Sequence, residues 1–144
     1  MHPAIQEKLE EYRAEHQNFI NELLHFIGIP LIVSPFLILT IKYQQFFPGL
    51  IVIAALYTIL GGWRGLALGA LLILSFILLK ETGYNDLRWS LGFFVIGWTL
   101  QIPGHYIFEK NEPALRKSWW HLLIAPLWWI EVICLYPLWK KIRA

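Results

Sequence analysis

The chain has 144 residues, of which 57% are hydrophobic and 15% are charged, whereas charged residues make up about 25% of a typical soluble domain. So few charges cannot supply the polar surface that a soluble domain of this size needs. The composition excludes a disordered chain and a nucleic-acid-binding module, and the net charge of +2 gives no reason to expect a polyanionic partner. The single cysteine, Cys134, excludes a secreted disulfide scaffold.

The first 22 residues form a polar segment that lacks the apolar stretch and the small-residue cleavage site of a signal peptide. Within it, Ile5, Leu9, Tyr12 and Phe19 recur at roughly helical spacing. We therefore expect an N-terminal amphipathic helix that leads directly into the first membrane span.

Long uncharged runs occupy most of the remaining chain, and about 20 apolar residues of helix cross the hydrocarbon core of a bilayer. We therefore predict an all-α protein, a polytopic membrane helical bundle with four to five membrane segments, in a single domain over residues 1–144. The uncharged runs cover residues 23–41, 43–63, 65–79 and 89–108, and a fifth run at 118–139 is broken only by Glu131.

Prolines and glycines shape these predicted spans. Pro30 and Pro35 are expected to bend or interrupt the first span. The stretch at residues 61–65 contains three glycines, which predicts a tight hairpin between the second and third spans. Gly65 and Gly69 are small enough to let neighbouring helices approach closely.

The order of the spans predicts which segments share a side of the membrane. Four spans separate His25 from His105, so both face the side on which the chain starts. If residues 118–139 cross fully, each side holds six basic residues, whereas a re-entrant hairpin at Pro126 and Glu131 gives nine against three. We favour the hairpin, which by the positive-inside rule places the histidines on the cytoplasmic side of a bacterial inner membrane or endoplasmic reticulum. Glu131 needs a partner, which a lysine or histidine could supply.

Four of the five histidines lie at predicted span ends on that same side: His16, His25, His105 and His121. Ionisable groups close to membrane depth point to a functional site. The simpler explanation for each histidine alone is a hydrogen-bonded polar residue at the interface. We assign no role to the terminal His2.

Sequence spacing indicates which of these side chains can meet. His105 and Glu109, like Asn21 and His25, are four residues apart and share a helical face. Glu109 could bind a metal together with His105, or it could orient the imidazole ring. His16 and His25 are half a turn out of phase and about 13 Å apart along a straight helix. A common site therefore requires a break between them or a fold-back of the N-terminal helix.

Two motifs resemble those of one family of small membrane proteins. The first has the pattern Y-x3-H-x4-N-x3-H-x2-G-x-P from Tyr12 to Pro30, and the second is Gln-Ile-Pro-Gly-His-Tyr-Ile-Phe-Glu at residues 101–109. Pro113–Leu115, Ala125, Pro126 and Glu131 follow in the same order. The chain is similar to the 2-hydroxy fatty acid dioxygenases of phytosphingosine α-oxidation, a family first catalogued as a domain of unknown function.

The resemblance implies an Fe(II)-dependent oxygenase in the lipid bilayer that uses dioxygen to shorten a 2-hydroxy fatty acid by one carbon. It implies iron ligands at His16, His25 and His105, with Asn21 and Glu109 as catalytic motif residues. The ligand role of His121 rests on its location alone. Imidazole and carboxylate donors suit non-haem iron.

Arg64 lies in the hairpin on the same side, and we consider it as a partner for the substrate carboxylate. The simpler explanation is a loop charge that sets the topology. Two other functions stay open: a haem-binding protein with axial histidines, and a non-catalytic lipid-interacting membrane protein. Trp128 and Trp129 could line a lipid pocket, although burial in the bundle is the commoner role.

Overall fold

The computed structural model describes residues 1–83, 86–110 and 119–142, with side chains up to residue 134. Every element in these ranges is a helix, which confirms the all-α prediction. The Pro113–Leu115 part of the predicted motif lies outside the described residues. The elements are α1 (Pro3–Ala14), α2 (Phe19–Lys42), the short 3-10 helix η1 (Gln44–Phe46), α3 (Phe47–Gly61), α4 (Trp63–Thr82), α5 (Leu87–Pro103), the π-helix η2 (Gly104–Glu109) and α7 (Trp120–Ile142).

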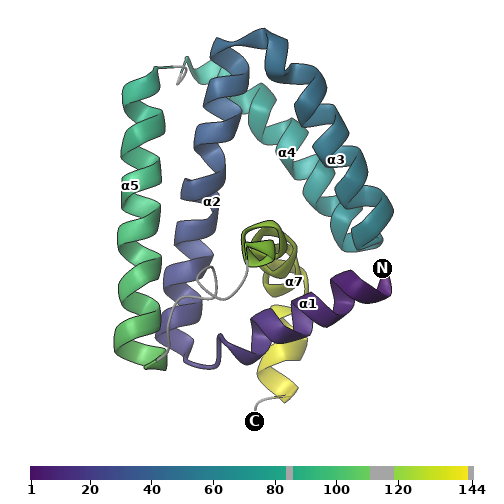
Figure 1. Cartoon of the computed structure of the whole chain (residues 1–144), viewed down its shortest axis with the longest axis vertical. Helices are drawn as coiled ribbons and strands as arrows, with labels where there is room; N and C mark the ends of the chain where they lie inside the picture. The colour runs from purple at the N-terminus through teal and green to yellow at the C-terminus, as the bar shows by residue number, and fades with distance from the viewer. Residues whose placement is uncertain (84–85, 111–118, 143–144) are drawn as a thin grey trace.

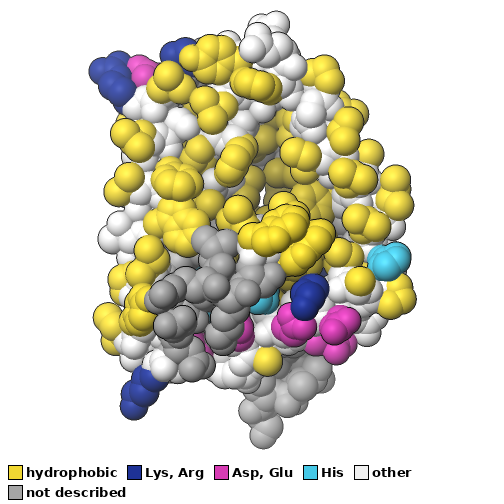
Figure 2. Space-filling view, viewed as in Figure 1, with side chains coloured by type: hydrophobic (Ala, Val, Ile, Leu, Met, Phe, Trp, Pro, Cys, Tyr) yellow, Lys and Arg dark blue, Asp and Glu magenta, His cyan; other side chains and the backbone are white. Residues whose placement is uncertain are grey.

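Three helical segments in the described part are long and apolar enough to cross a membrane: Phe19–Lys42, Gln44–Gly61 and Trp63–Thr82. They match the first three predicted spans. The fourth, α5, has 17 residues and is slightly shorter. Hydrophobic side chains cover most of the face in Figure 2, and charged ones gather at its upper and lower ends. This distribution fits a protein surrounded by lipid.

The N-terminal helix α1 packs across the lower end of the bundle, against α7 (Figure 1). Leu9 and Tyr12 are buried in this contact, as predicted from their spacing. Phe19 does not continue the stripe, because it begins α2 and is 62% exposed. The backbone N–H of His2 donates to the carbonyl of Leu60, which fixes the start of α1 beside the end of α3.

The most extensive helix contact joins α2 and α5, which lie side by side (Figure 1). Glycines permit the close approach: a Cβ atom on Gly28 would lie 3.1 Å from the carbonyl oxygen of Gly97, and one on Gly97 would lie 2.7 Å from Cγ1 of Ile32. The helix α2 runs without interruption through Pro30 and Pro35. The alternative of a discontinuous first span was therefore wrong.

The predicted hairpin between the second and third spans is confirmed. Gly62 adopts φ of +60° between α3 and α4, a conformation that residues with a side chain rarely adopt. A Cβ atom on Gly65 would lie only 1.7 Å from the carbonyl oxygen of Tyr57, and one on Gly69 would lie 3.2 Å from that of Ala54. Both glycines therefore allow the close packing that we expected of them.

The prediction of a re-entrant hairpin at the C-terminal end was wrong. The helix α7 continues through Pro126 and Glu131 without a turn. Figure 1 shows the start of α7 nearly end-on, whereas α2, α4 and α5 are seen along their length, so α7 crosses the bundle. Its far end lies at the same end of the molecule as α1. Because α7 crosses the bundle in this direction, Glu131 lies close to both α1 and α4.

We predict that Gly97→Ala weakens the fold, because the new methyl group would force α2 and α5 apart. Overpacking of this kind costs about 1–3 kcal/mol. The measurement is the thermal unfolding temperature in detergent.

The matched control is Gly92→Ala, also on α5, where a Cβ atom would meet nothing within 4 Å. This change is expected to be neutral or to stabilise the helix by up to about 1 kcal/mol. Equal destabilisation by both substitutions would contradict the proposed role of the glycine contact.

Candidate metal centre

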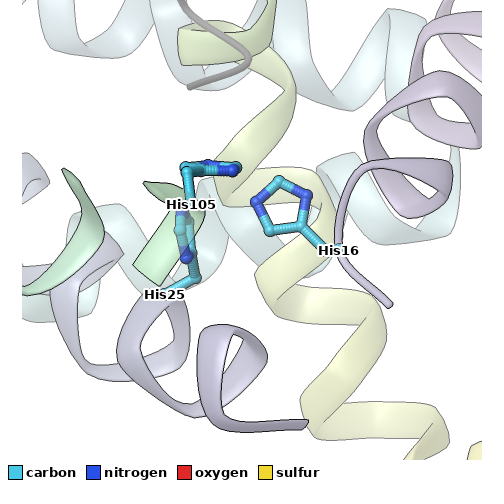
Figure 3. A group of neighbouring side chains, drawn as sticks. All are labelled: His16, His25 and His105. Atoms are coloured by element: carbon cyan, nitrogen blue, oxygen red, sulfur yellow. The ribbon is translucent and has the colours of Figure 1, made fainter. Parts of the chain in front are cut away.

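Three buried histidines come together at the lower end of the bundle: His16, His25 and His105 (Figure 3). We call them the histidine cluster. One potential ligand atom from each lies within 4.8 Å of the others. They come from the α1–α2 connection, α2 and η2 respectively, so the site depends on tertiary structure and not on one local motif. The prediction that four spans return His105 to the side of His25 agrees with this arrangement.

The break that the spacing of His16 and His25 required is present. The helix α1 ends at Ala14 and α2 begins at Phe19, and the side chain of Asn18 caps α2 by accepting from the N–H of Ile20. Asparagine is a favoured N-cap residue. Asn18 was therefore a signal for this break that our sequence analysis did not use.

Backbone carbonyls orient two of the imidazole rings. Nδ1 of His16 lies 2.7 Å from the carbonyl oxygen of Tyr12, and Nδ1 of His25 lies 2.9 Å from that of Asn21. A neutral histidine that donates from Nδ1 carries its lone pair on Nε2, which is the usual arrangement of a metal-binding histidine. Both rings thus have the tautomer that a metal needs.

The cluster is closed to water. The exposed fractions of His16, His25 and His105 are 0%, 2% and 4%. Ring centroids are 4.4 to 4.8 Å apart, and the rings meet edge to face. Burial, together with the neighbouring His25, lowers the pKa of His16 to about 2. The imidazole of His16 is therefore neutral near pH 7, as a metal ligand must be.

His105 lies on a π-helix, which the sequence analysis did not predict. The segment η2 continues α5 with wider turns from Gly104 to Glu109, and π-helical turns occur frequently at functional sites. A Cβ atom on Gly104 would lie 2.2 Å from Oδ1 of Asn21. The glycine before His105 thus lets η2 lie directly against α2.

Asn21 and Glu109 join the segments that carry the histidines. Oε1 of Glu109 accepts a hydrogen bond from the backbone N–H of Asn18 at 2.7 Å and one from Nδ2 of Asn21 at 3.3 Å. Glu109 is not among the three residues whose ligand atoms come together. Of the two roles that spacing left open, this geometry supports orientation of the site more than direct metal binding.

His121, at the start of α7, is a neighbour of the cluster and not one of its three members. Its Nε2 lies 3.9 Å from a carboxylate oxygen of Glu11, and its ring is 5.9 Å from that of Tyr12. Its ligand role stays a prediction.

Two aromatic residues form the wall of the cluster. Tyr12 stacks on His16 with ring centroids 4.1 Å apart, and the buried indole of Trp128 lies 5.5 Å from the same ring. Tyr12 begins the first sequence motif, whereas Trp128 comes from α7, and its burial agrees with the commoner of the two roles that the sequence left open. Both side chains exclude water from His16.

Glu131 has arginine partners, and the expectation of a lysine or histidine partner was wrong. Its carboxylate accepts from Arg13 at 2.8 Å and from Arg64 at 2.8 Å. The ion pairs join α1, α4 and α7, and the Glu131 side chain is 5% exposed. Arg64 therefore has a structural partner, and its contact with a substrate stays a prediction.

We predict that Glu109→Ala lowers the affinity for Fe(II) by about tenfold, the size of effect typical of residues that orient metal ligands. The substitution removes the acceptor that holds Asn18 and Asn21. Glu109→Gln keeps one oxygen for Asn18 and is expected to retain most of the affinity. Anaerobic titration of the purified protein with Fe(II) measures the effect.

The control is Glu81→Ala, at an exposed position, which is expected to leave the affinity unchanged. If Glu109→Gln binds Fe(II) as weakly as Glu109→Ala, the carboxylate charge itself is required, and direct binding of the metal by Glu109 is favoured instead.

Comparison with known proteins connects this geometry to a family. Residues 3–135 match the family described as 2-hydroxy-palmitic acid dioxygenase Mpo1-like. The chain is also 30% identical, over 141 residues, to the 2-hydroxy-palmitic acid dioxygenase MPO1 of Saccharomyces cerevisiae. The matched region covers 93% of this chain and 81% of the yeast protein. No solved structure matches the chain.

Proposed function

Because the chain belongs to the Mpo1-like family, we propose that it is an Fe(II)-dependent dioxygenase of the membrane that acts on 2-hydroxy fatty acids. The observation that carries the proposal is the histidine cluster, in which three imidazoles meet in a buried site. The family resemblance found in the sequence motifs is thereby joined to a site that can hold a metal.

The donor set fits iron. Imidazole nitrogens bind Fe(II) well, and a site with three protein ligands keeps positions open for substrate and dioxygen. When bound, the iron would supply the one-electron chemistry that lets dioxygen react with an organic substrate. His16, His25 and His105 would hold it, and we keep His121 as a candidate fourth ligand because it lies beside Tyr12.

The reaction balances without a further reductant. A 2-hydroxy fatty acid and one dioxygen molecule give a fatty acid one carbon shorter, carbon dioxide and water. All electrons for the reduction of dioxygen then come from the carbons of the substrate. The protein therefore needs a site for a fatty acid and for dioxygen, and no site for a reducing cofactor.

The chain's own residues position the reactants and exclude water. Asn21 and Glu109 hold η2 and the start of α2 together, which makes them positioning residues in this proposal. Arg64 would bind the substrate carboxylate. Its Nε is buried and, within the part of the chain that is described, has no hydrogen-bond partner, so one donor is available beyond those that reach Glu131.

A haem protein is less well supported. Axial ligation by paired histidines requires two imidazoles on opposite faces of a macrocycle, whereas these three rings are in edge-to-face contact and leave no gap between them for a porphyrin. An absorption spectrum without a Soret band would agree with this reasoning.

We also propose that the histidine cluster faces the cytoplasm. The basic residues of α1, the α3–α4 hairpin and the end of α7 belong to one end of the molecule. An excess of lysine and arginine marks the cytoplasmic side of membrane proteins.

We predict that His25→Ala and His105→Ala lose bound iron and dioxygen-dependent consumption of 2-hydroxypalmitate, because each removes a ligand. Chelation should abolish the activity of the wild type, and Fe(II) should restore it. Metal analysis and oxygen uptake measure the two effects. If His121 is a fourth ligand, His121→Ala lowers iron retention as well.

The control is His2→Ala, since His2 is exposed and remote from the cluster in sequence. Full activity in His25→Ala or His105→Ala would contradict the proposal. Turnover of the substrate by metal-free wild-type protein would contradict it as well.

We predict that Arg64→Ala raises the KM for 2-hydroxypalmitate by about tenfold, since a hydrogen bond to a charged group contributes about 1.5–3 kcal/mol. Little change in kcat is expected. Arg13 would still pair with Glu131, so the protein should fold.

Arg88→Ala, at an exposed position paired only with Asp86 among the described contacts, is the matched control. An unchanged KM together with a lower unfolding temperature would show that Arg64 is purely structural.

A further inference from the structure

An apolar cavity of about 430 Å³ lies between α2, α4 and α7. Figure 2 shows the molecule hollowed in this region, between the positions of α2 and α4 in Figure 1. Its volume is within the range of about 300–1,000 Å³ found for ligand pockets. We call it the acyl cavity, for the reasons that follow.

The lining of the acyl cavity suits a hydrocarbon and no polar ligand. It contains no charged side chain among the described residues. Two of its hydroxyl groups are already satisfied within their own helices, because Ser34 donates to the carbonyl of Leu31 and Thr82 to that of Leu79. These two groups therefore require no polar partner on an occupant, and Ser75 carries the one other hydroxyl group among the described lining residues.

One end of the acyl cavity adjoins the histidine cluster. Its wall includes Ile29, one helical turn after His25, and Trp129, which follows the residue that packs on His16. Trp129 stacks on Phe26, the neighbour of His25, and its indole N–H donates to the carbonyl of Phe26 at 2.7 Å. The cavity and the metal site thus share a wall.

The other end extends along α4 away from the histidines. Lining residues on α4 recur every three or four positions from Leu68 to Thr82, a rise of about 21 Å at 1.5 Å per residue. On α2 the lining reaches from Ile29 to Leu37. An occupant is therefore elongated and lies along the helices.

We propose that the acyl cavity holds the hydrocarbon tail of the 2-hydroxy fatty acid, with its hydroxyl and carboxyl end at the histidine cluster and its methyl end toward Thr82. This assignment rests on the proposed function. In this arrangement a longer tail reaches farther along α4, from Leu68 toward Thr82. The α4 residues would therefore determine which chain lengths the cavity accepts. A lipid chain of the bilayer is the competing occupant.

Ser75 tests the proposal, because it lies seven residues from Leu68 and seven from Thr82, halfway along the cavity. Ser75→Phe should lower kcat/KM for 2-hydroxypalmitate by about tenfold or more, the discrimination typical of a hydrophobic pocket. The value for 2-hydroxyoctanoate should stay the same, as should the iron content. The ratio of the two kcat/KM values is the measured quantity.

Two matched controls accompany this variant. Ser75→Ala removes the hydroxyl without filling the cavity. Leu74→Phe adds the same ring one residue away, at a residue that is 51% exposed and does not line the cavity. Both should keep the chain-length preference of the wild type. An unchanged preference in a folded Ser75→Phe would overturn the proposal and favour a bilayer lipid as occupant.

A labelling experiment separates failure of this inference from failure of the proposed function. The wild type in lipid nanodiscs is irradiated with a palmitate analogue that carries a diazirine near its methyl end, and labelled peptides are mapped by mass spectrometry. Label on α4 between Ser75 and Thr82 that excess 2-hydroxypalmitate displaces supports the site, even if the protein shows no turnover. Label confined to the lipid-facing residues of α3 overturns it, whatever the activity.

Discussion

The helices α2 and α5 approach closely at Gly28 and Gly97, and the placement of His25 beside His105 depends on this contact. In a bilayer, helices gain little from burying apolar surface against each other, so close backbone packing must hold them together. The contact continues downward to Gly104, which lies against Asn21. Two segments from distant parts of the sequence thereby bring potential ligand atoms of His25 and His105 within 4.8 Å of each other. Any side chain at these glycines would separate the two imidazoles as well as the helices.

A second constraint brings in the remaining histidine from outside the bundle. The capped break at Asn18 turns the chain so that His16 points back at His25 (Figure 3). Glu109 holds this connection through the N–H of Asn18, and the carbonyl of Tyr12 holds the ring of His16. Each bond contributes a modest free energy, and together they restrain His16 although it lies between two helices. The three imidazoles are therefore preorganised before any metal binds.

Much of this arrangement was predictable from the sequence. The remaining features could not be predicted, for identifiable physical reasons. Uncharged runs predicted the helices, and counting spans placed the histidines at one end. The π-helix at His105 escaped because its wider turns have no residue pattern of their own. The direction of α7 escaped because hydropathy measures how apolar a segment is and not how it lies. Arg13, as the partner of Glu131, escaped because 118 residues separate them and only the tertiary fold brings them together.

That same separation has a consequence for the order in which the protein is built. Contacts between α2 and α5, and between α3 and α4, can form as soon as residue 103 has been synthesised. The helix α1 cannot reach its final place then, because its partner α7, with Glu131, comes last from the ribosome. His16 follows α1 closely, so the first of the three cluster histidines to be synthesised is the last to join the cluster. During synthesis the histidine cluster is thus completed only when the whole bundle is in place, and a partly made chain brings together at most two of its three imidazoles.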